Sequence, residues 1–193
     1  PPPPPPLSLT PRPPSSTPVT PRRQLQMCIR DRCWRACNVI LPPMRSIPTA
    51  PLVLGLAGVI PFFWGALTYM SEPLAEWATS TLGPRFIGPY IQLFYGSIIL
   101  SFMSGVLWGF ATKAQGPQAA TGYALSVIPA LWAFFMTGGG PTTAGTNLIF
   151  GFLGLLILDF AFHSWGLAPP WWMSLRVLLT SLVVACLAVG VFL

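Results

Sequence analysis

The stretch that decides the fold is residues 95–109, YGSIILSFMSGVLWG, in the middle of an uncharged run of residues 86–112. About 20 apolar residues are enough for a helix to cross a bilayer, so this run can span one. Small residues recur in it at every fourth position and form one stripe along a helix. They are Ser97, Ser101, Gly105 and Gly109. Because membrane helices associate by close backbone approach at small residues, the stripe is predicted to be a packing seam at the centre of a helix bundle.

The composition indicates a membrane protein. Hydrophobic residues make up 53% of the chain and charged residues 7%, against about 25% charged residues in an ordinary soluble domain. A net charge of +6 would normally indicate an anionic partner, so its distribution matters. Six of the ten basic residues precede Met44, and from Met44 onward four basic residues face three acidic ones. No nucleic-acid-binding surface is therefore expected.

Residues 1–43 differ in amino-acid composition from the rest of the chain. They contain 13 of the 24 prolines and three of the four cysteines, and they cannot build a core. Residues 26–32, QMCIRDR, resemble the conceptual translation of a sequencing adapter. We therefore expect residues 1–43 to be spurious or disordered, with Met44 as the start. The proline density argues against an organellar transit helix, and the spacing of Cys28, Cys33 and Cys37 matches no standard zinc pattern.

The lengths of the uncharged runs predict an all-α fold, a polytopic transmembrane bundle of five spanning helices in residues 44–193. Between Lys113 and Asp159 the uncharged run is too long for one crossing, and the turn at residues 138–141, GGGP, divides it in two. Residues 71–82 have one apolar helical face and are predicted to lie in the membrane interface. The expected spans are residues 50–70, 90–111, 121–136, 146–162 and 173–193.

Two prolines fall inside predicted spans, and each is expected to kink its helix. Pro61 and Pro129 remove a backbone N–H and free a carbonyl that a neighbouring group must satisfy. Each follows Val-Ile and precedes a tryptophan by three residues, at Trp64 and Trp132. This match predicts a parallel repeat of helix pairs 1-2 and 3-4, numbering the predicted spans in chain order. The repeat aligns Ser101 with Asp159. The alternative is that the shared letters arise by chance among apolar helices.

The basic residues predict the orientation. With five spans, Arg45, Lys113 and Arg176 fall on one side of the membrane, whereas the other side has only Arg85, together with two glutamates. By the positive-inside rule the N-terminus is then cytoplasmic, or in the matrix in an organelle. The predicted location is a bacterial inner membrane, or the mitochondrial inner membrane if the source is eukaryotic.

Several stretches from residue 47 onward resemble one family of small membrane proteins, known as domain of unknown function 3429. They are GLAGVIPF, YGSIILSFMSGVLWG, LSVIPAL, GFLGLLILD and SLRVLLT. The second of these is the most specific. The family usually carries a histidine just before the tryptophan of that motif, whereas this chain has Leu107. The resemblance implies a five-helix inner-membrane protein and no established activity.

Asp159 is the one acidic residue inside a predicted span, which makes it a candidate functional site. Arg176 begins the next span on the same side of the membrane. One interpretation is an ion pair that pins the fourth helix to the fifth. The other adds His163, one helical turn beyond Asp159, as part of a proton or cation path.

No enzyme motif of the GxSxG, HExxH, P-loop or GxGxxG type occurs in the sequence. The predicted function is a non-catalytic scaffold or assembly protein, whose partners are the lipid bilayer and either other membrane proteins or a second copy. No cofactor and no metal are expected. The alternative is a small-solute or proton transporter that uses Asp159 and His163, and a membrane enzyme is a third possibility without a candidate nucleophile.

Overall fold

The computed structural model describes residues 47–192, and this part of the chain contains helices and no strand. Five helical segments in it are long and apolar enough to cross a membrane, which confirms the predicted all-α fold of five spans. The expectations for residues 1–43, for Met44 and for Arg45 lie outside the described residues. The helices are α2 (Thr49–Ala57), α3 (Ile60–Met70), α4 (Glu72–Leu82), η1 (Pro84–Phe86), α5 (Gly88–Ala111), α6 (Pro117–Met136), α7 (Pro141–Ser164) and α8 (Trp172–Phe192).

Prolines in the first turn set where the spans begin. α6 and α7 start at Pro117 and Pro141, before the predicted residues 121 and 146. Proline suits this position because its missing N–H would have no partner in the first turn of a helix. Gly116 precedes Pro117 with a φ of 62°, a left-handed conformation that favours glycine. Each turn therefore passes directly into a helix, and the spans are longer than the apolar pattern predicts.

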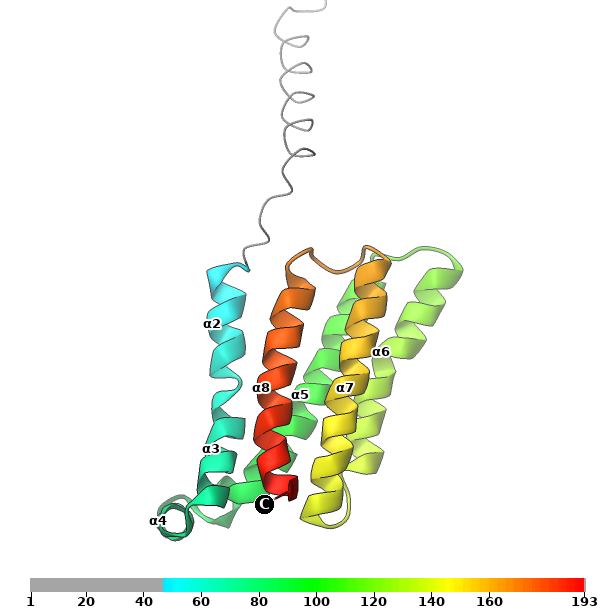
Figure 1. Ribbon diagram of the computed structural model, residues 1–193. Helices are drawn as coiled ribbons and strands as arrows, with labels where there is room; N and C mark the ends of the chain where they lie inside the picture. The colour runs from blue at the N-terminus through cyan, green and yellow to red at the C-terminus, as the bar shows by residue number, and fades with distance from the viewer. Residues whose placement is uncertain (1–46, 193) are drawn as a thin grey trace, which may run out of the picture. The chain divides into compact units, whose positions relative to one another are not determined.

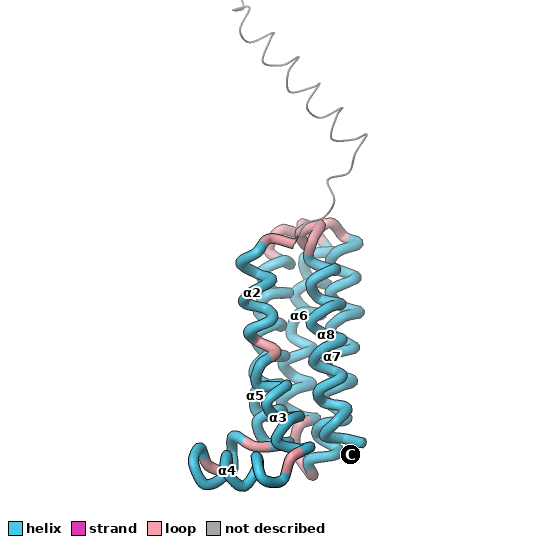
Figure 2. Tube along the Cα trace, turned by 60° about the vertical axis from the view of Figure 1, so that its left-hand side comes forward, coloured by secondary structure: helices cyan, strands magenta, loops and turns pink. Residues whose placement is uncertain are grey.

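The spans run alternately up and down, and α5 lies among them (Figure 1). α5 contacts α3, α6, α7 and α8, while the first span closes the bundle by packing on α8 through both α2 and α3. α4 is helical, as predicted, and lies across the direction of the spans at the end where α3 stops (Figure 2). This crosswise direction is the one expected of a helix in the membrane interface.

The buried face of α5 is not the face that the sequence predicts. Ser101, Gly105 and Gly109 are exposed, and Ser97 is half-buried. A Cβ atom added at Gly105 or Gly109 would have no neighbour within 4 Å. The buried face is instead rotated by about 100°, because Gly96, Leu100 and Ser104, each one position before a member of the stripe, pack inside the bundle. The buried residues of α5 are Gly88, Gln92, Gly96, Leu100, Met103, Ser104, Leu107 and Ala111.

The physical reason is that the buried face combines small residues with large ones. Leu100 and Leu107 are fully buried and supply many van der Waals contacts. Gly96 leaves room for Leu148 of α7, since a Cβ there would lie 3.1 Å from a Leu148 methyl group. The predicted stripe offers close approach but little side-chain surface, so it is not the packing seam within this chain.

The two prolines act differently. At Pro61 the first span is interrupted, because α2 ends at Ala57 and α3 begins at Ile60. Pro129 lies inside α6, which continues through it. The predicted parallel repeat stays a prediction, and its aligned pair differs in environment, since Ser101 is exposed whereas Asp159 is fully buried.

Candidate functional site

The candidate site lies where α7 turns back into α8. α7 ends in a Schellman motif, in which the Leu167 N–H bonds the Phe162 carbonyl at 3.1 Å and the Gly166 N–H bonds the His163 carbonyl at 2.9 Å. Gly166 has a φ of 73°, which this motif requires and which glycine adopts without strain. The short loop that follows brings the first turns of α8 beside the last turns of α7.

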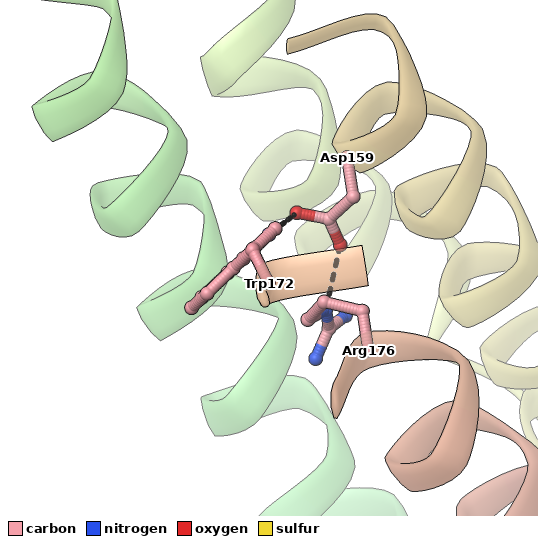
Figure 3. Close-up of polar contacts among 3 residues, drawn as sticks. All are labelled: Asp159, Trp172 and Arg176. Atoms are coloured by element: carbon pink, nitrogen blue, oxygen red, sulfur yellow. Dashed lines mark hydrogen bonds and ion pairs between the residues drawn. The ribbon is translucent and has the colours of Figure 1, made fainter. Parts of the chain in front are cut away.

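Asp159 of α7 is held from two directions (Figure 3). The Arg176 Nε group donates to Asp159 Oδ2 at 2.6 Å, and the Trp172 Nε1 group donates to Asp159 Oδ1 at 2.8 Å. Asp159 is 0% exposed and Arg176 is 5% exposed. Charge-assisted hydrogen bonds of this length are strong, and this pair is shielded from solvent. The structure thus brings together Asp159 and Arg176, two of the three predicted site residues.

The third predicted residue, His163, is not bonded to this pair. It lies on α7 one turn beyond Asp159 and is half-buried. Its Nδ1 atom is buried and has no hydrogen-bond partner in the part of the chain that the structure describes. Both oxygens of Asp159 instead accept hydrogen bonds from α8, so the carboxylate joins α7 to α8.

Trp172 is a site residue that the sequence analysis missed. Besides bonding Asp159, its ring packs edge-on against Phe110 of α5 with the ring centroids 5.1 Å apart. It thereby links α5, α7 and α8 at one point. The spacing could have revealed it, because Trp172 and Arg176 are four residues apart and so share one face of α8.

Gln92 is a second buried polar residue without a role in the predictions. Its Nε2 group donates to the Phe62 carbonyl of α3 at 2.9 Å and to the Cys186 carbonyl of α8 at 3.0 Å. Gln92 is 2% exposed, so these two hydrogen bonds join α3, α5 and α8 in the interior of the bundle. It is the only side-chain amide in the predicted second span, which is the signal that could have identified it.

A cavity of about 540 Å³ lies between α2, α5 and α8, beside the Asp159 cluster. Its lining is largely apolar, but Arg176 and Thr180 of α8 both line it. Among the described residues, no group of three or more His, Cys, Asp or Glu side chains could hold a metal ion.

The chain has recognisable relatives. The family described as "Protein of unknown function (DUF3429)" matches residues 47–192. Transmembrane protein 69 of Xenopus tropicalis is 34% identical over 145 residues, covering 73% of this chain and 53% of the relative. Transmembrane protein 69 of Mus musculus is 28% identical over 178 residues, covering 80% of this chain and 67% of the relative. The chain thus spans about half the length of the frog protein, and no solved structure matches it significantly.

Proposed function

The chain belongs to the family described as "Protein of unknown function (DUF3429)", and we propose that it is a non-catalytic assembly protein that binds a helix of another polypeptide on the exposed face of α5. Its five apolar spans and the names of its relatives both indicate that it is a multi-pass membrane protein. Its surroundings are therefore lipid, and the surfaces available to a partner are the outer faces of its helices.

One observation carries the proposal: Ser101, Gly105 and Gly109 are all exposed, and a Cβ added at either glycine would have no neighbour within 4 Å in the described chain. Glycine inside a helix costs about 1 kcal/mol relative to alanine, so a position without a neighbour gains nothing from it. Glycines that the fold uses are crowded. At Gly151 an added Cβ would lie 2.8 Å from the Trp132 ring. The exposed row therefore fits a close contact with a helix from outside the chain.

Transport through Asp159 and His163 is the second candidate. One observation favours it, namely the buried His163 Nδ1 atom without a partner one turn from Asp159. The ion pair with Arg176 argues against it, because the charge of Asp159 already has a fixed partner on the neighbouring helix. Assembly is therefore our first choice.

We also propose that the N-terminus faces the cytoplasm, or the matrix in an organelle. Lys113 and Arg176 lie at the same end of the bundle, and the Lys113 Nζ group donates to the Leu167 carbonyl of the α7–α8 loop at 3.2 Å. Arg85 lies in η1, at the opposite end. This bias supports the proposed orientation. The membrane that we propose is an inner membrane, in bacteria or in mitochondria.

Substitution of the exposed glycines tests the proposal. The full chain with Gly105→Leu and Gly109→Leu is extracted from native membranes in a mild detergent, and the mass of its complex is compared with that of the unsubstituted chain. We expect loss of the larger complex with unchanged thermal unfolding. Ser181→Leu, at an exposed position of α8, is the control. A complex that survives the double substitution would contradict the proposal.

A further inference from the structure

We propose that the cavity between α2, α5 and α8 binds an uncharged, lipid-soluble carbonyl compound, whose oxygen accepts hydrogen bonds from Arg176 and Thr180. This site goes beyond the proposed assembly function and uses other residues. Two buried donors without partners, a balanced charge and an aromatic wall support it, and each is considered in turn.

The two donors lie together on one face of α8. In the described part of the chain, Arg176 Nη2 and Thr180 Oγ1 are buried and have no hydrogen-bond partner. Arg176 is 5% exposed and Thr180 is 3% exposed. Four residues apart on a helix, they are neighbours, and both line the cavity. Figure 3 shows the Arg176 side chain extending from α8 toward α5, which supplies the facing wall.

A bilayer interior offers no water to satisfy such donors, so an unpaired N–H or O–H there is costly. A carbonyl oxygen has two lone pairs and can accept both bonds at once. The Nε group of Arg176 is already bound to Asp159 Oδ2, which fixes the guanidinium and leaves Nη2 for the ligand. The Arg176 donor is thus held in place before a ligand arrives.

The charge balance selects an uncharged ligand. Among residues 47–192, Arg176 is the one charged residue that lines the cavity, and its charge is matched by Asp159 at 2.6 Å. A carboxylate or phosphate would leave a net negative charge buried beside Asp159, which a low-dielectric environment strongly disfavours. A ketone or ester oxygen accepts the same hydrogen bonds without that penalty.

The rest of the cavity suits the apolar body of such a compound. Its volume of about 540 Å³ lies within the range of ordinary small-molecule sites. Leu54 and Phe102 line it and are 73% and 65% exposed, so it opens on the outer surface of the bundle, where lipid-soluble molecules enter. Aromatic side chains form much of its wall, among them Tyr95, Phe102, Phe110, Trp171 and Trp172. Both the ring ketone of a quinone and the ester of an acylglycerol carry the required carbonyl.

Native mass spectrometry of the full chain in detergent tests the site. The probes are decylubiquinone, dioctanoylglycerol, the carbonyl-free decylbenzene and the anionic dioctanoyl phosphatidic acid, each at the same mole fraction. We expect one of the two uncharged carbonyl probes to be retained best. If decylubiquinone is retained best, the carbonyl that the cavity binds is a ring ketone. If dioctanoylglycerol is retained best, it is an ester. Equal retention of decylbenzene, or a preference for the phosphatidic acid, would overturn the proposal.

Two substitutions locate the binding. Thr180→Val keeps the shape of the side chain but removes the donor, and should weaken retention of the preferred probe about tenfold. Thr121→Val is the control, since the exposed Thr121 hydroxyl bonds the Pro117 carbonyl of its own helix. Ile99→Trp fills the cavity from α5 and should abolish retention. Undiminished binding in either Thr180→Val or Ile99→Trp, with thermal unfolding like that of the parent, would also overturn the proposal.

Discussion

The Ser104 hydroxyl of α5 donates a hydrogen bond to the Ser126 carbonyl of α6, and it also accepts one from the Ala130 N–H at 3.2 Å. In an uninterrupted helix Ala130 would bond Ser126 directly, since the two are four residues apart. Pro129 lies between them and disturbs that turn. A side chain from the neighbouring helix thus completes the backbone bonding of α6, which explains why α6 continues through its proline.

Ser104→Ala should destabilise the protein by about 2 kcal/mol, because it leaves a half-buried N–H and a buried carbonyl without this partner. Thermal unfolding in detergent measures the effect. Ser101→Ala is the matched control, since the exposed Ser101 hydroxyl bonds only the Ser97 carbonyl of its own helix. In a Pro129→Ala background the helix can bond itself, so the cost of Ser104→Ala should shrink. An equal cost in both backgrounds would contradict this account.

Breaking the buried ion pair should be costly. Asp159→Asn leaves the Arg176 charge uncompensated in the bundle, and we expect a loss of about 3 kcal/mol. Arg176→Gln added to Asp159→Asn should cost less than the sum of the two single changes, because the second change removes the unpaired charge. Thermal unfolding of the four proteins in detergent gives the coupling. Strict additivity would show that the two side chains do not interact.

The five spans could be predicted because they depend on local sequence. The length of an uncharged run and a turn such as residues 138–141 are read from adjacent residues. The proximity of Asp159 and Arg176 followed from the same reasoning, since a short loop returns the chain to one side of the membrane. The spacing of Trp172 and Arg176 places both on one face of α8, but it does not by itself show that Trp172 bonds Asp159, because a tryptophan at a helix end is equally typical of an interface anchor.

Which face of α5 turns into the bundle could not be predicted either, and the reason is a different one. Two neighbouring faces of this helix both carry small residues, Gly96 and Ser104 on one, Gly105 and Gly109 on the other. Which face turns inward depends on the partners: Leu148 packs at Gly96, and Ser104 bonds across to α6. Those contacts are long-range in sequence, so a periodic pattern in one helix does not reveal them.

The contact between α3 and α5 predicts a glycine that tolerates no side chain. A Cβ added at Gly65 would lie 2.5 Å from Gln92 Cγ, so Gly65→Ala should displace the amide that joins α3, α5 and α8. We expect a loss of about 2 kcal/mol in thermal unfolding, typical of overpacking in a core. Gly105→Ala, where an added Cβ has no neighbour, should be neutral or slightly stabilising. Similar effects of both substitutions would contradict the described packing.

The anchoring role of Asp159 predicts no proton transport. Liposomes that contain the full chain and a trapped pH-sensitive dye should show no proton flux above that of empty liposomes when a pH gradient is applied. Asp159 is paired with Arg176 at 2.6 Å and also bonded by Trp172, so both of its described side-chain partners are fixed donors on α8. A flux that disappears in Asp159→Asn would instead establish the transporter function.

Site-directed cross-linking tests the central claim, that another helix packs on the small-residue face of α5. In the full chain with its four cysteines replaced, Ser101→Cys is labelled with a benzophenone maleimide and irradiated in native membranes. Ser181→Cys on α8 is the control, an exposed serine that likewise bonds only its own helix, at the Val177 carbonyl. We predict one discrete adduct of higher mass from position 101 and none from position 181. No discrete adduct at 101, or the same adducts at both positions, would contradict the account.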